Sequence, residues 1–212
     1  MNRPAETNDW PRSGSRKGLI LLALLLGACA TDPTVHQANV ETRDASGFTI
    51  RDDVQADSAV RSDFDRALVL LEQEQYQQAI DVLERVVQKA PQATAAHIDL
   101  GIAYGRIDDL EKAEASIRKA LEINPHHPVA HNELGMVYRR TGRFQAARHS
   151  YESALAEHPE FHYARLNLAI LCDVYLADLG CALENYELYS RAVPDDEEAA
   201  IWIADVRNRA GR

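Results

Sequence analysis

Residues 131–159 read HNELGMVYRRTGRFQAARHSYESALAEHP, and this stretch decides the fold because residues 97–125, HIDLGIAYGRIDDLEKAEASIRKALEINP, repeat its design. The two stretches start 34 residues apart and carry small, aromatic and proline residues at the same offsets. The spacing extends along the chain through the prolines Pro91, Pro125, Pro159 and, one residue late, Pro194. A fixed period of this length indicates an array of repeated helical or mixed units rather than a single irregular core.

Each unit has the pattern of two antiparallel helices. In the second unit, apolar residues recur at helical spacing over 96–106 and again over 110–123, with a turn at 107–109 between them. In the third unit the turn is 141–143, where Gly142 provides a left-handed C-cap. Small residues at two fixed phases predict helix axes that approach closely. They are Ala67, Gly101, Gly135 and Ala169, then Ala79, Ala113, Ala147 and Ala182.

These residues resemble the tetratricopeptide repeat. The match is closest in the two middle units, at Leu100-Gly101, Tyr104, Ala113, Ile117, Ala120 and Pro125, and at Leu134-Gly135, Tyr138, Ala147, Tyr151, Ala154 and Pro159. The resemblance implies an all-α fold, a right-handed superhelical solenoid of about four helix pairs. We place the repeats at 60–93, 94–127, 128–161 and 162–195. A capping helix at 196–209 completes a domain of residues 57–212 and covers the last repeat, as a solenoid requires for solubility.

The resemblance also implies a concave groove that binds protein partners, lined by the first helix of each pair. Carrying the groove positions over residue by residue gives Phe64, Leu68, Ile98, Ile102, Asn132, Met136, Arg139, Leu166, Ile170 and Asp173. This stripe is mostly apolar, which favours an amphipathic helix or a hydrophobic segment as the occupant. The alternative is that about half of these side chains pack between neighbouring repeats. The basic clamp of chaperone-binding members is absent.

The first 28 residues have the pattern of an export signal. Arg12, Arg16 and Lys17 precede an aliphatic run at 19–26, which has about half of the roughly twenty apolar residues that span a bilayer. Leu26-Gly27-Ala28-Cys29 resembles the lipobox of bacterial lipoproteins, which implies cleavage before Cys29 and acylation of that cysteine. Two or three acyl chains hold a protein stably at a membrane. Because alanine follows Cys29, we expect the periplasmic face of the outer membrane; the alternative is an ordinary secretory signal.

Residues 29–56 are rich in Thr, Asp, Gln, Ala and Ser, and we expect a flexible tether between lipid and domain. The more apolar stretch Gly47-Phe48-Thr49-Ile50 leaves open a short docked segment instead. Charge divides at the same boundary. The leader carries four basic and two acidic groups of a chain total of 23 and 33, so a net charge of +2 precedes Cys29 and −12 follows. This acidity argues against nucleic-acid binding, which requires a basic surface.

No catalytic signature appears: the chain has no nucleophile elbow, phosphate-binding glycine loop or zinc-protease helix motif. We therefore expect no enzyme activity, no cofactor and no metal. The expected function is a lipid-anchored periplasmic adaptor that assists assembly of an envelope machine, such as a pilus secretin or an outer-membrane complex. The alternatives are an adaptor for peptidoglycan hydrolases or proteases, and a metal- or ligand-binding protein.

The last alternative rests on histidines near two inter-repeat turns, namely His126, His127, His131, His158 and His162. His97 and His131 also have a packing role, because they stand where the family often has an aromatic residue. Arg139, Arg140 and Arg143 form a basic patch, which is either a solvated face or a contact for an acidic partner. Cys172 and Cys181 lie on either side of the turn of the fourth unit. We favour a disulfide between them over two buried thiols, because export favours oxidation.

Overall fold

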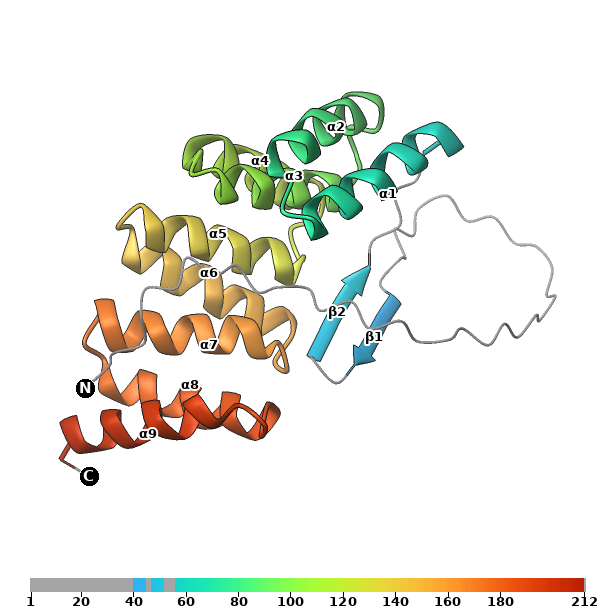
Figure 1. Cartoon of the computed structure of the whole chain (residues 1–212). Coiled ribbons are helices and arrows are strands. Elements are labelled where there is room, and N and C mark those ends of the chain that lie inside the picture. Colours follow the sequence, from blue (N-terminus) through green and yellow to red (C-terminus); the bar gives the residue numbers. More distant parts are fainter. Residues whose placement is uncertain (1–39, 45–46, 52–55, 212) are drawn as a thin grey trace.

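The structure is a computed structural model that describes residues 40–44, 47–51 and 56–211 (Figure 1). The two helices of the second unit, predicted over 96–106 and 110–123, span 94–106 and 110–123. The pairs are α1 (Ser58–Glu72) with α2 (Tyr76–Lys89), α3 (Thr94–Arg106) with α4 (Leu110–Ile123), α5 (Pro128–Arg140) with α6 (Phe144–Glu157), and α7 (His162–Ile170) with α8 (Leu179–Ala192); α9 (Glu197–Arg209) follows. The all-α repeat solenoid is confirmed for the domain. None of the described helices is both long and apolar enough to cross a membrane.

Three kinds of helix contact build the solenoid. Each first helix packs along its own second helix, and each second helix packs against the first helix of the next pair. The first helices α1, α3, α5 and α7 also contact one another in series, so they form one continuous row, which Figure 1 shows for α5 and α7. This row is the surface on which the sequence places the groove.

The small residues lie where the helices of a pair meet. All six alanines of the two predicted phases, Ala67, Ala79, Ala113, Ala147, Ala169 and Ala182, have no exposed surface. The large side chains that follow each second-helix alanine fill the space beside them: Leu83, Ile117, Tyr151 and Tyr186 are also fully buried. The predicted close approach of the axes is therefore confirmed.

Each turn within a pair contains one residue in the left-handed region. Gly142 has φ of +74°, as its position in the turn predicts. The corresponding residues of the other turns are Glu74, Asp108 and Ala177, with φ of 60°, 68° and 53°. The same backbone geometry thus recurs in the turns of all four pairs. Among these turns, that of the third pair alone has a glycine, which adopts positive φ without steric cost.

The fourth pair accommodates its additional residue by a change of helix type. The chain leaves α7 through one π-helical turn, η1 (Leu171–Tyr175), before the α7–α8 turn. A π turn holds more residues than an α turn, so it absorbs an insertion without breaking the helix. This explains why Pro194 follows Pro159 after 35 residues rather than 34.

Regular structure also occurs before the solenoid. Strands β1 (Val40–Asp44) and β2 (Gly47–Arg51) pair antiparallel, with Thr42 opposite Thr49. The tether expected over residues 29–56 therefore contains a strand pair, which its polar composition did not indicate. The stretch 47–50 belongs to β2, whose described partner is β1. The predicted signal segment and Cys29 lie outside the described residues.

Candidate functional site

The candidate site is the surface of the row of first helices. Direct bonds fix the register of neighbouring helices in this row. Asn167 of α7 donates from Nδ2 to Oδ1 of Asn132 in α5 at 3.0 Å. Arg140 of α5 donates from Nη1 to the carbonyl oxygen of Gly105 in α3 at 2.6 Å. Because these bonds join residues 35 apart, each helix lies in the same way against the one before it.

The predicted groove residues divide into three groups by exposure. Four are buried, with exposed fractions of 8% or less: Phe64, Ile98, Asn132 and Met136. Five are half-buried: Ile102, Arg139, Leu166, Ile170 and Asp173. Leu68 is exposed at 37%. The alternative in which about half of the stripe packs between repeats therefore describes the buried group, and the half-buried and exposed apolar residues remain as candidates for partner contact.

Asp173 is held inside the structure rather than presented to a partner. Its carboxylate forms an ion pair with Arg209 of α9 and accepts from the hydroxyl of Tyr186 at 3.5 Å. Only 7% of its side chain is exposed. Asp173 therefore joins the last repeat to α9. Arg139 is also turned inward, since its Nε atom is buried.

Two further exposed apolar residues lie in η1 and α9, outside the set of groove residues predicted from the sequence. Val174 follows Ile170 by four residues in η1 and is 37% exposed, and Ile201 of α9 is 64% exposed. The sequence does contain a signal for Ile201. The fourth unit is 35 residues long because of its additional residue, so Ile201 stands one unit after the groove residue Leu166. It was overlooked because α9 was interpreted as a cap alone.

Two arginines of the predicted basic patch, Arg140 and Arg143, join the third repeat to the second. Arg140 pairs with Asp108 at 2.7 Å across the neighbouring turn. Arg143 pairs with Glu114 of α4, and its guanidinium lies 4.3 Å from the centre of the Tyr138 ring. Arg118 donates to the Tyr138 hydroxyl at 2.7 Å. Hydrogen bonds from Arg143 and then from Arg118 lower the pKa of Glu114 below its ordinary value of 4.5.

We expect Arg143→Ala to lower the free energy of unfolding by about 1 kcal/mol, since it removes one partly exposed ion pair and one cation–π contact. A urea titration followed by circular dichroism measures this. Because the pKa of Glu114 is lowered on folding, the ion-pair part is present above the ordinary carboxylate pKa and is lost as the pH falls through the folded-state pKa. Arg85→Ala is the control, because its bond at 2.6 Å joins residues of the same helix. If the two variants lost equal free energies of unfolding, the contacts of Arg143 between repeats would contribute no more than a bond within one helix.

The histidines serve the turns between repeats. His97 and His131 bond through Nε2 to the carbonyl oxygens of Pro91 and Pro125, at 3.1 and 2.8 Å. His127 accepts at Nδ1 from the backbone N–H of Ala130 and so caps α5. Burial lowers the pKa of His97. Within the described part of the chain these histidines are not gathered with a third ligand, so the structure gives the metal-binding alternative no support.

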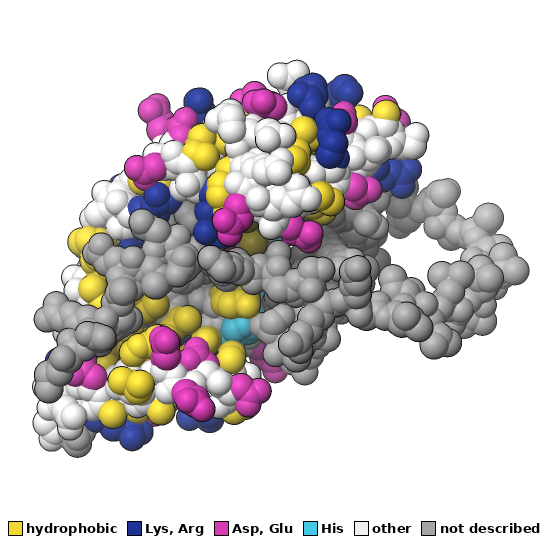
Figure 2. Space-filling model, viewed as in Figure 1, with side chains coloured by type: hydrophobic (Ala, Val, Ile, Leu, Met, Phe, Trp, Pro, Cys, Tyr) yellow, Lys and Arg dark blue, Asp and Glu magenta, His cyan; other side chains and the backbone are white. Residues whose placement is uncertain are grey.

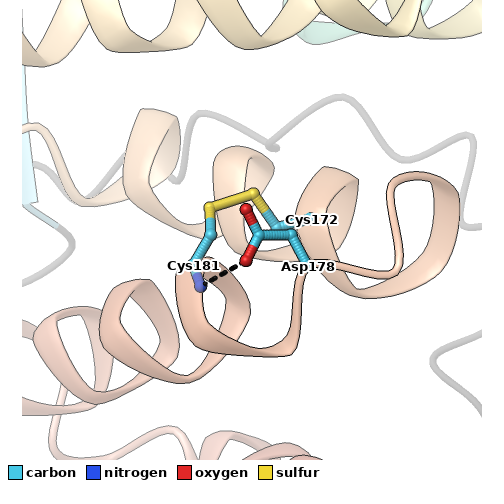
Figure 3. Close-up of side chains that lie close together, drawn as sticks. All are labelled: Cys172, Asp178 and Cys181. Carbon is cyan, nitrogen blue, oxygen red and sulfur yellow. Dashed lines mark hydrogen bonds between the residues drawn. A yellow bond between two sulfur atoms is a disulfide. The ribbon is translucent and has the colours of Figure 1, made fainter.

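The two cysteines of the fourth pair are bonded to each other (Figure 3). Cys172 of η1 and Cys181 of α8 have Cα atoms 5.9 Å apart. Asp178 lies beside the disulfide, accepts from the backbone N–H of Cys181 at 3.1 Å and pairs with Arg148 of α6 at 3.1 Å. These bonds lower the pKa of Asp178, with the Cys181 bond as the larger cause. The group has the residue types of a metal site, but the disulfide occupies both sulfur atoms.

A shallow cleft of about 340 Å³ lies between α2 and α4, over two residues of α3. Its floor holds Leu100 and Tyr104, and the Tyr104 hydroxyl donates to Glu84 at 2.5 Å. Burial and this carboxylate raise the pKa of Tyr104, so the hydroxyl stays protonated. The floor of this cleft is therefore packed and hydrogen-bonded.

Comparison with known proteins agrees with this architecture. Two sequence models of the tetratricopeptide repeat match residues 70–135 and 132–173. No curated protein matches the chain in sequence. Among solved structures, PilF of Pseudomonas aeruginosa is similar with a TM-score of 0.66 and 20% identity, over 72% of this chain and 69% of PilF.

Two further structures share the fold. MamA of Desulfovibrio magneticus RS-1 has a TM-score of 0.64 and 17% identity, over 73% of this chain and 87% of MamA. The first repeat domain of Spaghetti (RPAP3), bound to an HSP90 peptide, has a TM-score of 0.54 and 21% identity, over 59% of this chain and 99% of that domain. At these identities the likeness establishes the fold alone.

Proposed function

Since the chain belongs to the tetratricopeptide repeat family, we propose that it is a non-enzymatic scaffold that binds a protein partner on its row of first helices. The observation that carries this proposal is the set of half-buried and exposed apolar side chains on that row, including Ile102, Ile170 and Leu68. Apolar side chains in a helical groove suit a hydrophobic or amphipathic segment. The Spaghetti domain is bound to an HSP90 peptide, so this fold accepts a short peptide in that protein.

We further propose that the scaffold acts at the periplasmic face of the bacterial outer membrane, anchored through a lipid on Cys29. The support is the sequence alone: a basic leader, a short aliphatic run and the Leu26-Gly27-Ala28-Cys29 motif. The disulfide between Cys172 and Cys181 is consistent with an oxidising compartment. An envelope assembly, such as a pilus secretin or an outer-membrane complex, is the class of partner that this location favours.

We expect Ile102→Glu to weaken partner binding at least about tenfold, because it places a charge within an apolar contact. Photo-crosslinking in cells from position 68 or 166, followed by identification of the adducts, measures binding. Ile107→Glu is the matched control, since Ile107 is 41% exposed in the turn after α3. The proposal fails if Ile102→Glu keeps its adducts while circular dichroism shows the helices intact. Ile170→Glu provides a second test should Ile102→Glu not fold.

The anchor has its own test. We expect Cys29→Ser to move the protein from the membrane fraction to the soluble periplasmic fraction, because no acyl chain is attached. Immunoblots of separated fractions, with incorporation of labelled palmitate, measure this. Cys172→Ser is the control, because it changes a cysteine that the structure places in a disulfide. Membrane residence of Cys29→Ser would refute lipid anchoring and leave the scaffold proposal standing.

A further inference from the structure

Helix α9 continues the row of first helices. Arg209 of α9 pairs with Asp173 of η1, 36 residues earlier, much as Arg140 of α5 bonds Gly105 of α3, 35 residues earlier. The difference of one residue is the insertion that η1 absorbs. The helix therefore lies against the fourth pair as a further first helix, beyond its role as a cap.

The register of α9 places Ile201 on the partner-binding surface. Its inward face is formed by Ala199 and Val206, both fully buried, and by Trp202, whose ring centre lies 5.5 Å from that of Tyr186. Ile201 is outside this packed face and is 64% exposed. The core thus gives no reason for a large apolar side chain at this position.

Ile201 lies near the end of a longer apolar stripe. Leu166, Ile170 and Val174 follow one another at intervals of four residues along α7 and η1. With Ile201 they make up what we call the C-terminal apolar surface. Figure 2 shows hydrophobic side chains gathered over α7 and α9, with acidic side chains beside them. Side chains spaced at four residues form a ridge, and such a ridge packs into a groove on the surface of a second helix.

The charge beside this surface is negative. Glu197 and Glu198 occupy the first turn of α9, and both are exposed. Neither forms an ion pair with any side chain in the described ranges, whereas Asp205 further along the helix is paired with Arg209 at 2.9 Å. The helix dipole favours acidic groups at this end, and two unpaired carboxylates also attract a cationic partner.

We propose that the C-terminal apolar surface binds an amphipathic helix whose apolar face contacts Ile201, Ile170 and Val174 and whose Lys or Arg side chains pair with Glu197 and Glu198. This inference rests on the proposed scaffold function and names the chemistry of the partner. It assigns α9 a binding role in addition to its structural one.

A model peptide tests the inference. The full chain is titrated into a fluorescent 14-residue helix of Leu and Lys, and into a matched helix of Leu and Glu, with anisotropy as the readout. We expect the Lys peptide to bind at least about tenfold more tightly, and this preference to shrink as ionic strength rises from about 0.01 to about 0.15 M. Ile201→Gln is expected to weaken binding of the Lys peptide about tenfold, and Glu198→Lys about threefold or more.

Matched control variants distinguish binding at the C-terminal apolar surface from non-specific binding to other exposed apolar or acidic residues. Ile107→Gln changes an exposed isoleucine elsewhere, and Glu111→Lys changes an acidic residue in the first turn of α4. Both are expected to keep the affinity within about twofold, as substitutions outside an interface do. Melting temperatures verify that all four variants are folded.

Several results would overturn the inference. These are no binding of the Lys peptide, equal binding of both peptides, or unchanged binding by Ile201→Gln. Self-association of the chain that Ile201→Gln abolishes, seen by sedimentation, would assign the surface to a second copy instead. If adducts from position 68 form in the unchanged chain and are lost in Ile102→Glu, the scaffold function stands and the inference alone falls.

Discussion

Gly135→Leu is expected to lower the free energy of unfolding by about 3 kcal/mol, more than a hundredfold in the unfolding equilibrium, because overpacking a close helix contact costs this much. A Cβ atom on Gly135 would lie 2.5 Å from Cε1 and 2.6 Å from Cδ1 of Tyr151. The Tyr151 side chain is fully buried, and a close-packed interior leaves such a ring little room to shift. To admit a side chain, α5 must separate from α6. A urea titration followed by circular dichroism measures the loss.

Gly180→Ala is the matched control, because it tests a glycine without a close contact. The nearest atom to its added Cβ is Oδ1 of Asp178 at 3.6 Å, and the residue lies in the first turn of α8. Alanine restricts the unfolded chain more than glycine does, so we expect Gly180→Ala to raise the free energy of unfolding by about 0.5 kcal/mol. A Gly135→Leu protein as stable as the unchanged chain would mean that the helices of the third pair do not touch at this position.

The period of 34 residues predicts most of the fold because packing within a helix pair is local. Gly135 lies at one of the two phases of small residues from which a close approach of the helix axes is predicted, although the sequence does not indicate that Tyr151, 16 residues later, is the side chain it meets. The same argument located the α3–α4 turn and the left-handed Gly142. It did not find β1 and β2, since strand pairing outside the repeats depends on the order of a few Thr, Val and Ile residues in a polar segment.

The binding surface is less predictable than the fold, because exposure depends on how neighbouring repeats meet. Groove position alone gives Asn132 and Ile201 the same status, yet their exposed fractions are 1% and 64%. Asp173 was predicted to line the partner groove, but its carboxylate forms an ion pair with Arg209 of α9. The sequence contains both residues of such a pair without indicating that they meet. His131 is a similar case. The sequence predicts a packing role for it but does not indicate its hydrogen bond to the carbonyl oxygen of Pro125.

Reduction of the Cys172–Cys181 disulfide is expected to lower the free energy of unfolding by about 2.5–3 kcal/mol, the chain-entropy value for a closed loop with this sequence separation of 9. In a domain of this size the loss corresponds to a fall of about 5–10 °C in melting temperature. Thermal denaturation with and without a dithiol reductant measures it. The variant that combines Cys172→Ala with Cys181→Ala is the control, expected to melt at the lower temperature under both conditions.

The loss is expected to concentrate at one end of the molecule. In a repeat array each unit is stabilised by its neighbours, so opening begins where an interface is weakest. The disulfide joins η1 to α8, and α9 packs on α8, so reduction loosens the support of α9 as well. Amides of α8 and α9 should therefore exchange with solvent faster after reduction, while those of α3 and α4 keep their rates. Uniform acceleration along the chain would show instead that the solenoid unfolds as one unit, and an unchanged melting temperature with both thiols free would refute a stabilising role for the disulfide.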